Sequence, residues 1–187
     1  MKWLHINATE MSLQPPLQGK RLSNLLMACL FLCAVASILV LRWRYFMVVE
    51  VTSNSMFPTL LIGDRILFLK DAYRRSDPHR GDIVVLRRPN GDGELIIKRV
   101  VGLQGEVITA YGGKVYINGK PLDEPYIRGV ATAWIKPTLI PEGHVYLLGD
   151  NRPSSEDSRD FGPVPVKSLL GRALLRVLPI DRFGRVH

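Results

Sequence analysis

Two serines lie close together in the stretch Ser-Asn-Ser-Met-Phe-Pro-Thr-Leu at residues 53–60. Pro58 disfavours the α region for Phe57, so the stretch predicts a tight, exposed turn and not a helix. The turn carries the hydroxyls of Ser53 and Ser55. A serine hydroxyl is a weak nucleophile until a base takes its proton. These residues could therefore attack a carbonyl group, provided that the fold brings a base to them.

Histidine is the commonest base for this chemistry, but none of the four histidines is placed well for it. They stand before a long apolar segment, in a polar loop, at a turn and at the last position: His5, His79, His144 and His187. We expect each of them to be solvated. The chain also lacks the H-x-x-x-H and C-x-x-C spacings of metal sites, so it predicts no metal and no cofactor.

Lys98 is the better candidate for the base. It lies in the run Leu95 to Val101, and strand alternation places it on one face between Ile96 and Val100. Apolar neighbours that remove an ammonium group from water lower its pKa. A neutral lysine amine could then accept the serine proton. The pattern leaves another interpretation open, in which Lys98 and Arg99 are an ordinary basic pair at a sheet edge.

The composition limits the class of protein. The chain has 187 residues, of which 47% are apolar and 22% are charged, and this balance excludes wholesale disorder. The net charge is +8, which suits an anionic partner such as nucleic acid or lipid head groups. Both cysteines, Cys29 and Cys33, lie inside one apolar segment, so the rest of the chain cannot form an internal disulfide.

That apolar segment runs from Leu22 to Leu41 without a charged residue. A helix needs about 20 such residues to cross a bilayer, whereas a cleaved signal peptide has an apolar region of roughly 7–15 residues. The sequence therefore predicts a transmembrane helix over 22–41. The preceding residues 1–21 form a short arm, and its basic residues weakly favour a cytoplasmic amino terminus.

The chain after Arg44 consists of short, β-rich runs separated by turn residues, which predicts an all-β domain over 46–187. We expect a barrel-like or sandwich sheet. Residues 122–141 are expected to be irregular, and 165–170 to form one helical turn. The expected strands are 46–51, 65–69, 83–86, 95–101, 107–111, 115–117, 145–148 and 173–178, with hairpin turns at 112–113 and 118–119.

Four stretches in a fixed order resemble the type I signal peptidases, which are membrane-anchored serine proteases that remove signal peptides from exported proteins. The stretches are Ser-Asn-Ser-Met-Phe-Pro-Thr-Leu (53–60), Arg-Gly-Asp-Ile-Val-Val (80–85), Ile-Lys-Arg-Val-Val-Gly-Leu (97–103) and Gly-Asp-Asn-Arg-Pro-Ser-Ser-Glu-Asp-Ser-Arg (149–159). Their order behind an apolar segment resembles the short form of the family, which has one membrane helix and a mainly β catalytic domain.

The resemblance implies a role for each matching residue. Ser55 corresponds to the nucleophile and Lys98 to the general base of a Ser/Lys dyad. The Ser53 hydroxyl and the Ser55 N–H correspond to the oxyanion hole. Ser155 matches the serine that orients the lysine.

Asp157 and Arg159 match a structural ion pair beside the site. The resemblance also implies signal peptides of exported preproteins as substrates and the lipid bilayer as a partner, with the protein translocation machinery nearby. It places the catalytic domain on the outer face of a bacterial cell membrane or a thylakoid membrane, and the amino terminus in the cytoplasm. It implies no nucleic-acid partner, although self-cleaving repressors also use Ser/Lys dyads on a related fold.

The sequence departs from the family pattern at Gln104, Glu106 and Pro153, none of which belongs to the expected dyad. Two other functions stay open at this point. One is a specialised peptidase of the same superfamily that processes a single conjugation or pilus substrate. The other is a membrane-anchored binding module without activity.

Overall fold

The computed structural model of the chain describes residues 18–89, 91, 93–127 and 134–186, with side chains from Ser23 onward. The arm expected over residues 1–21 falls largely outside the described residues, as do His5 and His187. The chain divides into two compact units, Met1–Val40 and Leu41–His187.

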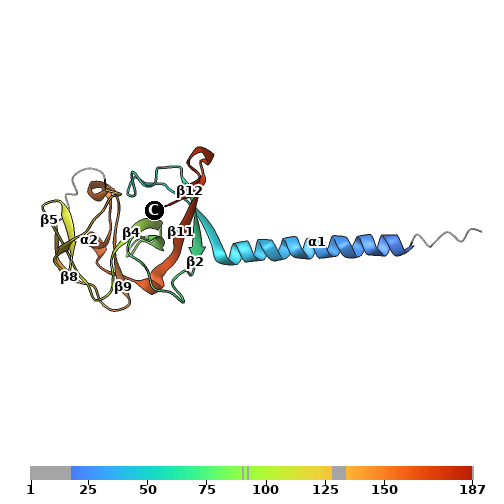
Figure 1. Cartoon of the computed structure of the whole chain (residues 1–187), viewed down its shortest axis with the longest axis horizontal. Helices are drawn as coiled ribbons and strands as arrows, with labels where there is room; N and C mark the ends of the chain where they lie inside the picture. Colours follow the sequence, from blue (N-terminus) through green and yellow to red (C-terminus); the bar gives the residue numbers. More distant parts are fainter. Residues whose placement is uncertain (1–17, 90, 92, 128–133, 187) are drawn as a thin grey trace, which may run out of the picture. The chain divides into compact units, whose positions relative to one another are not determined.

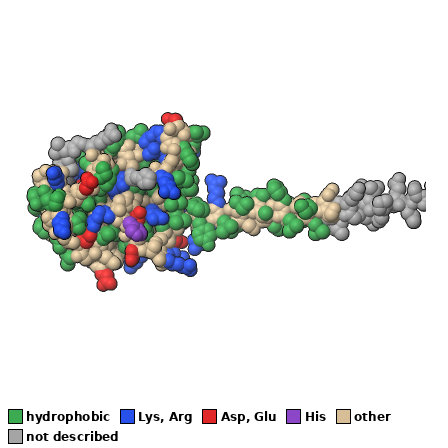
Figure 2. All heavy atoms as spheres, viewed as in Figure 1, with side chains coloured by type: hydrophobic (Ala, Val, Ile, Leu, Met, Phe, Trp, Pro, Cys, Tyr) green, Lys and Arg blue, Asp and Glu red, His purple; other side chains and the backbone are tan. Residues whose placement is uncertain are grey.

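The described part of the first unit belongs to helix α1, which spans Gln18–Tyr45 and crosses the unit boundary. The predicted segment 22–41 lies inside this helix, which is longer at both ends. Within α1, the stretch Ser23–Tyr45 has a mean hydropathy of 2.6 in its most apolar window, and none of that window is buried. Figure 2 shows the hydrophobic side chains along the helix. The stretch has the length and composition of a membrane span. Its exposed apolar side chains are also those expected of a helix that lies in lipid.

The second unit is built from two antiparallel sheets (Figure 1). The large sheet has the order β1-β2-β11-β3-β4-β9-β10, with β12 added to β11, and the small sheet has the order β7-β6-β5-β8. The pairings found among the described residues do not join β10 back to β1, so the large sheet is open and not a closed barrel. The prediction of a mainly β fold behind one amino-terminal helix is confirmed.

The strands of the large sheet are β1 (Phe46–Glu50), β2 (Arg65–Lys70), β3 (Ile83–Arg87), β4 (Leu95–Gly102), β9 (His144–Leu148), β10 (Val164–Pro165), β11 (Leu169–Leu178) and β12 (Gly184–Arg185). Those of the small sheet are β5 (Val107–Tyr111), β6 (Lys114–Ile117), β7 (Lys120–Pro121) and β8 (Ile135–Leu139). The helical segments are η1 (Arg152–Ser154), α2 (Ser158–Phe161), η2 (Val166–Ser168) and η3 (Ile180–Arg182).

Most predicted strands are found within a residue or two of their expected bounds, but the region 122–141 corrects the prediction. It was expected to be irregular, and it contains strand β8. This strand carries Pro137, which lacks the N–H of a paired strand residue. Because β8 is an edge strand of the small sheet, the proline is tolerated there. Strand β11 also begins earlier than the predicted 173, and it lies inside the sheet between β2 and β3.

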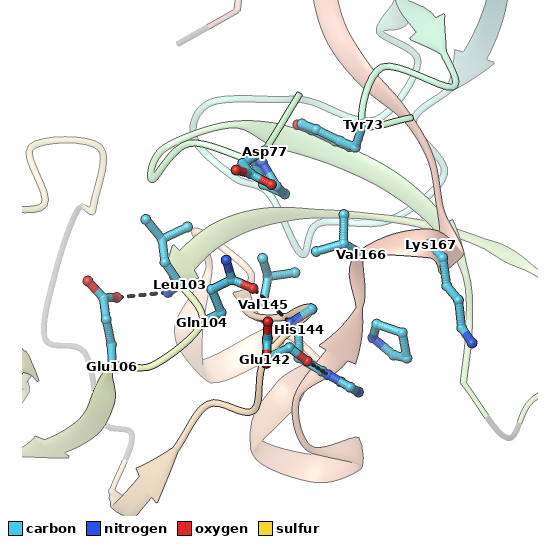
Figure 3. A pocket seen from close by; sticks show the side chains of 13 residues that line it. Tyr73, Asp77, Leu103, Gln104, Glu106, Glu142, His144, Val145, Val166 and Lys167 are labelled. Atoms are coloured by element: carbon cyan, nitrogen blue, oxygen red, sulfur yellow. Dashed lines mark hydrogen bonds between the residues drawn. The ribbon is translucent and has the colours of Figure 1, made fainter. Parts of the chain in front are cut away.

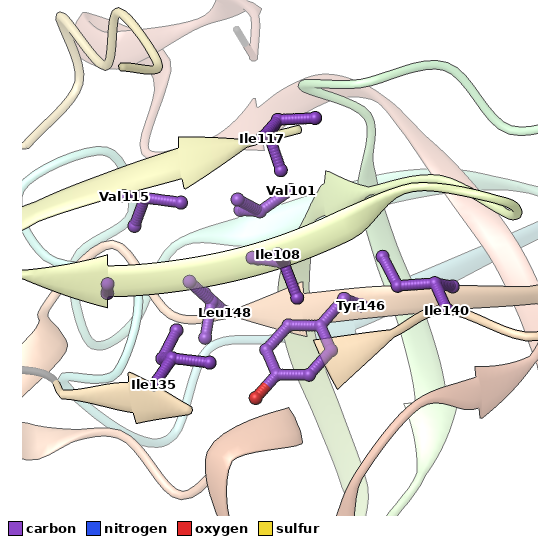
Figure 4. Close-up of a cluster of buried hydrophobic side chains, with 9 residues drawn as sticks. Val101, Ile108, Val115, Ile117, Ile135, Ile140, Tyr146 and Leu148 are labelled. Atoms are coloured by element: carbon purple, nitrogen blue, oxygen red, sulfur yellow. The ribbon is translucent and has the colours of Figure 1, made fainter. Parts of the chain in front are cut away.

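Three clusters of buried apolar side chains hold this unit together, and β4 contributes to all of them. Ile97 packs with β2 and with the serine turn, which is residues 53–60. Val100 packs with β3 and β9, and Val101 packs against residues of the small sheet. Figure 4 shows the last of these clusters. Strand β4 lies between β3 and β9. The interpretation of Lys98 and Arg99 as a basic pair at a sheet edge is therefore wrong, since both are almost fully buried.

Candidate active site

The turn that carries Ser55 is fixed by its own core contacts. The N–H of Val51 donates to the carbonyl of Asp64 at 2.8 Å, and the N–H of Leu60 donates to the carbonyl of Met56 at 2.9 Å, so the turn is closed at its base and in its middle. Met56 and Leu60 are buried, whereas Phe57 is 47% exposed. Ser55 itself is only 8% exposed, which is less than the predicted exposed turn implies.

The Ser53 and Ser55 hydroxyl oxygens lie 3.3 Å apart, within hydrogen-bonding distance. One hydroxyl therefore approaches the other from two residues upstream in the same turn. This places a second hydroxyl donor beside any oxygen that develops charge when Ser55 reacts.

The loop after β9 is tied to the serine turn through its backbone. The N–H of Asn151 donates to the carbonyl of Ser55 at 3.0 Å, and its side-chain amide donates to the carbonyl of Asn54 at 3.1 Å. Asp150 accepts a hydrogen bond from the Thr59 hydroxyl at 2.5 Å. These bonds join two segments that are almost a hundred residues apart in the sequence, and they hold the loop against the turn.

Asp150 also connects this loop to β4. Its carboxylate receives Nε and Nη2 of Arg99 at 2.8 and 2.6 Å, and both side chains are almost completely buried. The Arg99 guanidinium lies over the ring of Tyr126, 3.9 Å from its centroid. A buried charge is tolerated only when it is paired and hydrogen-bonded in this way.

Gly149 lies where the parts of the site come closest together. A Cβ at this position would stand 2.2 Å from the Ser155 Oγ and 2.5 Å from the Ser55 carbonyl oxygen. Only glycine fits such an approach. The Gly149 N–H donates to the Asp157 carboxylate at 3.0 Å. The Ser155 side chain therefore lies beside the main chain of Ser55, although Ser155 is not among the residues that line the pocket shared by Ser55 and Lys98.

The Ser155 Oγ is buried and has no hydrogen-bond partner among the described residues. Two positions along, Asp157 is fully buried and forms a bidentate ion pair with Arg159 at 2.7 and 2.8 Å. Asp157 also caps the short helix α2 by accepting from the Arg159 N–H. The segment that carries Ser155 is thus held rigidly from its far end.

Lys98 shares a pocket of about 410 Å³ with both serines. The pocket is lined by residues of the serine turn, by β4 and by the segment after β9. Its walls include Ser53, Ser55, Met56, Arg88, Glu94, Ile97, Lys98 and Glu156. The fold therefore brings the expected nucleophile and the expected base to one cavity, although they are 43 positions apart in the sequence.

The environment of Lys98 disfavours the protonated amine compared with water. Burial lowers its pKa to about 8, while the carboxylates of Asp157 and Glu156 raise it and the guanidinium groups of Arg88 and Arg159 lower it. Desolvation is the largest of these effects, as the apolar neighbours in the sequence predict. An ordinary lysine would leave only about one amine in 2,500 neutral at pH 7, whereas a pKa near 8 suits a general base.

A larger pocket of about 810 Å³ lies elsewhere in the second unit and shares no lining residue with the Ser55 pocket. Figure 3 shows its walls, which include Tyr73, His144 and Val166. Gln104 and Glu106, which depart from the family pattern, also line it. His79 and His144 are absent from the Ser55 pocket, and the described residues contain no group of three or more side chains that could hold a metal.

The residues that sequence reasoning missed are those that hold the site together. Asp150 and Asn151 belong to the family-like stretch 149–159, but nothing in their spacing assigns them to Arg99 and to the Ser55 carbonyl. The Arg88 contacts to Glu94 and Glu156 were also missed. The nearest signal was the cluster of polar residues after a buried strand, which is often a site-forming loop.

Comparisons with known proteins identify the family of the chain. The family model described as "Signal peptidase, peptidase S26" matches residues 22–178. The chain is 41% identical over 143 residues to a signal peptidase I of Leptolyngbya laminosa, covering 73% of this chain and 70% of that protein. It is 36% identical over 164 residues to a probable signal peptidase I-1 of Synechocystis sp., covering 83% and 84%.

A signal peptidase I of Bacillus caldolyticus is 34% identical over 165 residues, covering 81% of this chain and 90% of that protein. A solved signal peptidase I of Enterococcus faecalis V583 has a TM-score of 0.47 and 33% identity, covering 52% of this chain and 97% of that one. The matched residues include all four stretches on which the resemblance was built. The chain therefore belongs to the peptidase S26 family of signal peptidases.

Proposed function

We propose that the chain is a membrane-anchored serine endopeptidase that cleaves amino-terminal signal peptides from exported preproteins by a Ser55/Lys98 dyad. The observation that carries this proposal is that Ser55 and a buried Lys98 line the same pocket. Family membership supplies the substrate class, and the pocket supplies a nucleophile with a base.

The reaction follows from these positions. The Lys98 amine takes the proton of Ser55, whose Oγ attacks the carbonyl carbon of the scissile peptide bond. The resulting oxyanion accepts hydrogen bonds from the Ser55 N–H and the Ser53 hydroxyl. One such donor contributes about 2.7–4 kcal/mol to the stability of the transition state. The Lys98 ammonium then protonates the leaving amine, and a water deprotonated by Lys98 releases the acyl group from Ser55.

Ser155 orients the base in this scheme. Its hydroxyl is buried beside the Ser55 main chain and unpartnered among the described residues, so it is available to the Lys98 amine. The Asp157–Arg159 ion pair fixes the segment from which Ser155 projects. A lysine amine on a flexible four-carbon stem needs such a partner if it is to reach one hydroxyl repeatedly.

Helix α1 is the membrane anchor in this proposal. Its apolar stretch has the length and composition of a bilayer span. The amino terminus faces the cytoplasm and the catalytic unit works on the outer face of a bacterial cell membrane or a thylakoid membrane. The lipid bilayer and signal-peptide-bearing preproteins are then its partners, close to the translocation machinery.

The test uses the full chain in detergent with a panel of preproteins. Ser55→Ala and Lys98→Arg should each lower cleavage by at least about a thousandfold, since members of a nucleophile–base unit act together. Arginine keeps the charge but does not lose its proton. Cleavage by the unaltered chain should rise with pH through about 8, because the amine must be neutral to act.

Ser168→Ala and Lys167→Arg are matched controls, since both residues are exposed and lie outside the Ser55 pocket. Circular dichroism and the melting temperature should show that all four variants fold. If either dyad variant cleaved preproteins as well as its control does, the proposed dyad would be wrong.

A further inference from the structure

The wall of the catalytic pocket contains an arginine that lies between two carboxylates. Arg88 follows strand β3, and its Nη2 lies 2.5 Å from Glu94 Oε2. Its Nη1 lies 3.6 Å from Glu156 Oε2. All three residues line the pocket that holds Ser55 and Lys98. Arg88 therefore joins the β3–β4 hairpin to the segment that follows β9.

The direction of the Arg88 side chain is set by the hairpin. Its N–H donates to the Glu94 carbonyl at 2.8 Å, which closes the hairpin behind it. The Gly91 backbone lies against its stem, since a Cβ there would be 2.8 Å from the Arg88 Cδ. The side chain is 34% exposed, so it is a partly enclosed part of the pocket wall and not a free surface arginine.

The far end of this bridge lies next to the residues that serve the base. Glu156 stands between Ser155, whose buried hydroxyl approaches the Ser55 main chain, and Asp157, which accepts the Gly149 N–H. A contact that holds Glu156 therefore acts on the segment that carries Ser155. The Asp157–Arg159 pair holds the same segment from its other side.

The charges around Lys98 show what else this arginine does. The carboxylates of Asp157 and Glu156 favour the protonated amine, and the guanidinium groups of Arg88 and Arg159 oppose it. Arg159 is committed to Asp157 by two short contacts. Arg88 pairs with Glu94 and also contacts Glu156, so it is the guanidinium that directly opposes the Glu156 carboxylate beside Lys98. The remaining acids of the pocket wall are Glu94, which pairs with Arg88, and Glu50, which pairs with Arg65.

We propose that Arg88 is a positioning residue for Lys98: its ion pairs to Glu94 and Glu156 tie the hairpin to the Ser155 segment and keep one cation in the wall of the pocket beside the base. The inference rests on the proposed Ser55/Lys98 dyad. Arg88 touches neither the nucleophile nor the scissile bond in this scheme, and it acts through the base alone.

Two substitutions separate this role from a purely structural one. Arg88→Gln and Glu156→Gln both break the Arg88–Glu156 contact, and Arg88→Gln also breaks the pair with Glu94, but the two variants change the charge near Lys98 in opposite directions. A structural tie would respond alike to both. Charge compensation moves the acidic limb of the pH profile upward for the first variant and downward for the second.

The experiment measures kcat/KM from pH 6 to 10.5 with the full chain in detergent and an internally quenched peptide that contains a signal-peptide cleavage site. Arg88→Gln should move the acidic limb up by about 0.5–1 pH unit and lower kcat/KM at pH 7 by about 3- to 10-fold. Glu156→Gln should move the limb down by about half a unit, and the double variant should return it close to its original pH.

Arg87→Gln is the matched control, since the neighbouring arginine is exposed, bonds the Gly93 carbonyl and does not line the pocket. It should leave the limb within about 0.2 pH units because its charge is screened by solvent. Limbs that stay in place, or that move in the same direction in both single variants, would overturn the proposal. Lys98→Arg, measured beside them, keeps the two hypotheses apart: activity in that variant removes the dyad itself.

Discussion

Lys98 carries its amine into the interior of the protein, where only 3% of the residue is exposed. The same burial that would suit the amine to its proposed role as the base also opposes folding, because a protonated amine must leave water. The pKa is lowered from 10.5 to about 8, which corresponds to about 3 kcal/mol of lost stability. The site is therefore a place where function and stability oppose one another.

The stability cost of burying the Lys98 amine should depend on pH. Below pH 8 the amine is protonated in the folded and the unfolded chain, so the full cost is present. Between pH 8 and 10.5 the folded chain loses its proton first, and the cost fades as the pH rises. Lys98→Met, which keeps the volume and removes the charge, should raise the free energy of unfolding at pH 7 by about 1–3 kcal/mol.

Denaturant unfolding of the two proteins at pH 7 and pH 10 measures this difference. The stabilisation of the Lys98→Met variant should shrink at the higher pH, while other titrating groups cancel between the two proteins. Lys167→Met serves as the control, because its amine is exposed and should give no pH-dependent difference. A constant gap between the Lys98 variant and the unaltered chain would contradict the buried charge.

Among the elements of the fold, strand β4 and the loop after β9 are joined by the Arg99–Asp150 pair. Arg99 comes from the middle of the sheet, and Asp150 comes from the loop that also bonds the Ser55 carbonyl through Asn151. The position of Ser55 therefore depends on a buried charge pair that takes no part in the proposed reaction.

Breaking that pair from one side should be costly. Asp150→Ala leaves the Arg99 guanidinium buried without its carboxylate and should lower the free energy of unfolding by about 3–5 kcal/mol. The double variant Arg99→Met with Asp150→Ala should recover part of this loss, since it removes the buried positive charge. Urea unfolding at pH 7 measures both. A mild effect of Asp150→Ala would show that water reaches the guanidinium.

The exposed pair between Arg65 and Glu50, 3.1 Å apart on β2 and β1, is the comparison. Glu50→Gln should cost less than about 1 kcal/mol, because solvent screens the charges and both side chains keep their freedom. Comparing the loss in free energy of unfolding for the buried Arg99–Asp150 pair and the exposed Arg65–Glu50 pair shows how much of the effect comes from burial.

The elements also show how far sequence patterns reach. Alternation in Leu95 to Val101 predicted Ile96 and Val100 on one face, and both belong to one apolar cluster. It predicted Ile97 and Val101 on the other face, and these two pack in two further clusters. Gly112 and Gly113 adopt positive φ, as their hairpin prediction requires. Strands of two residues, such as Val164–Pro165, are too short to show any period.

Contacts between distant segments were beyond the sequence. The pairing of β11 with both β2 and β3 joins parts of the chain that lie about a hundred residues apart, and no local propensity encodes it. The family motifs predicted Ser55, Lys98 and Ser155, and the pocket brings the first two together. The close approach at Gly149 needed coordinates, since it depends on two segments meeting.

At the scale of the whole molecule, the chain consists of two units with different requirements. All three apolar clusters of the second unit draw their buried side chains from residues 51–169, and none comes from the apolar stretch of α1. The buried clusters of the second unit are thus built without side chains from that stretch. None of the most apolar window of α1 is buried among the residues that the structure describes, which suits the proposed role of a membrane anchor.

This division predicts that peptide cleavage by the second unit can be separated from attachment to the membrane through α1. Removal of residues 1–40 should leave a folded unit whose melting temperature in detergent lies within about 3 °C of the full chain, since the core is untouched. Cleavage of a soluble peptide should stay within about threefold. Cleavage of a preprotein embedded in lipid vesicles should fall by about 10²-fold or more, because the anchor no longer raises the local concentration of the enzyme at the membrane.

Replacing the apolar stretch of α1 with an unrelated span of about 20 leucines and alanines should restore vesicle activity, since only length and apolar character are required of an anchor. Unchanged vesicle activity after truncation, or failure of the unrelated span to restore it, would show that α1 does something other than tether the catalytic unit.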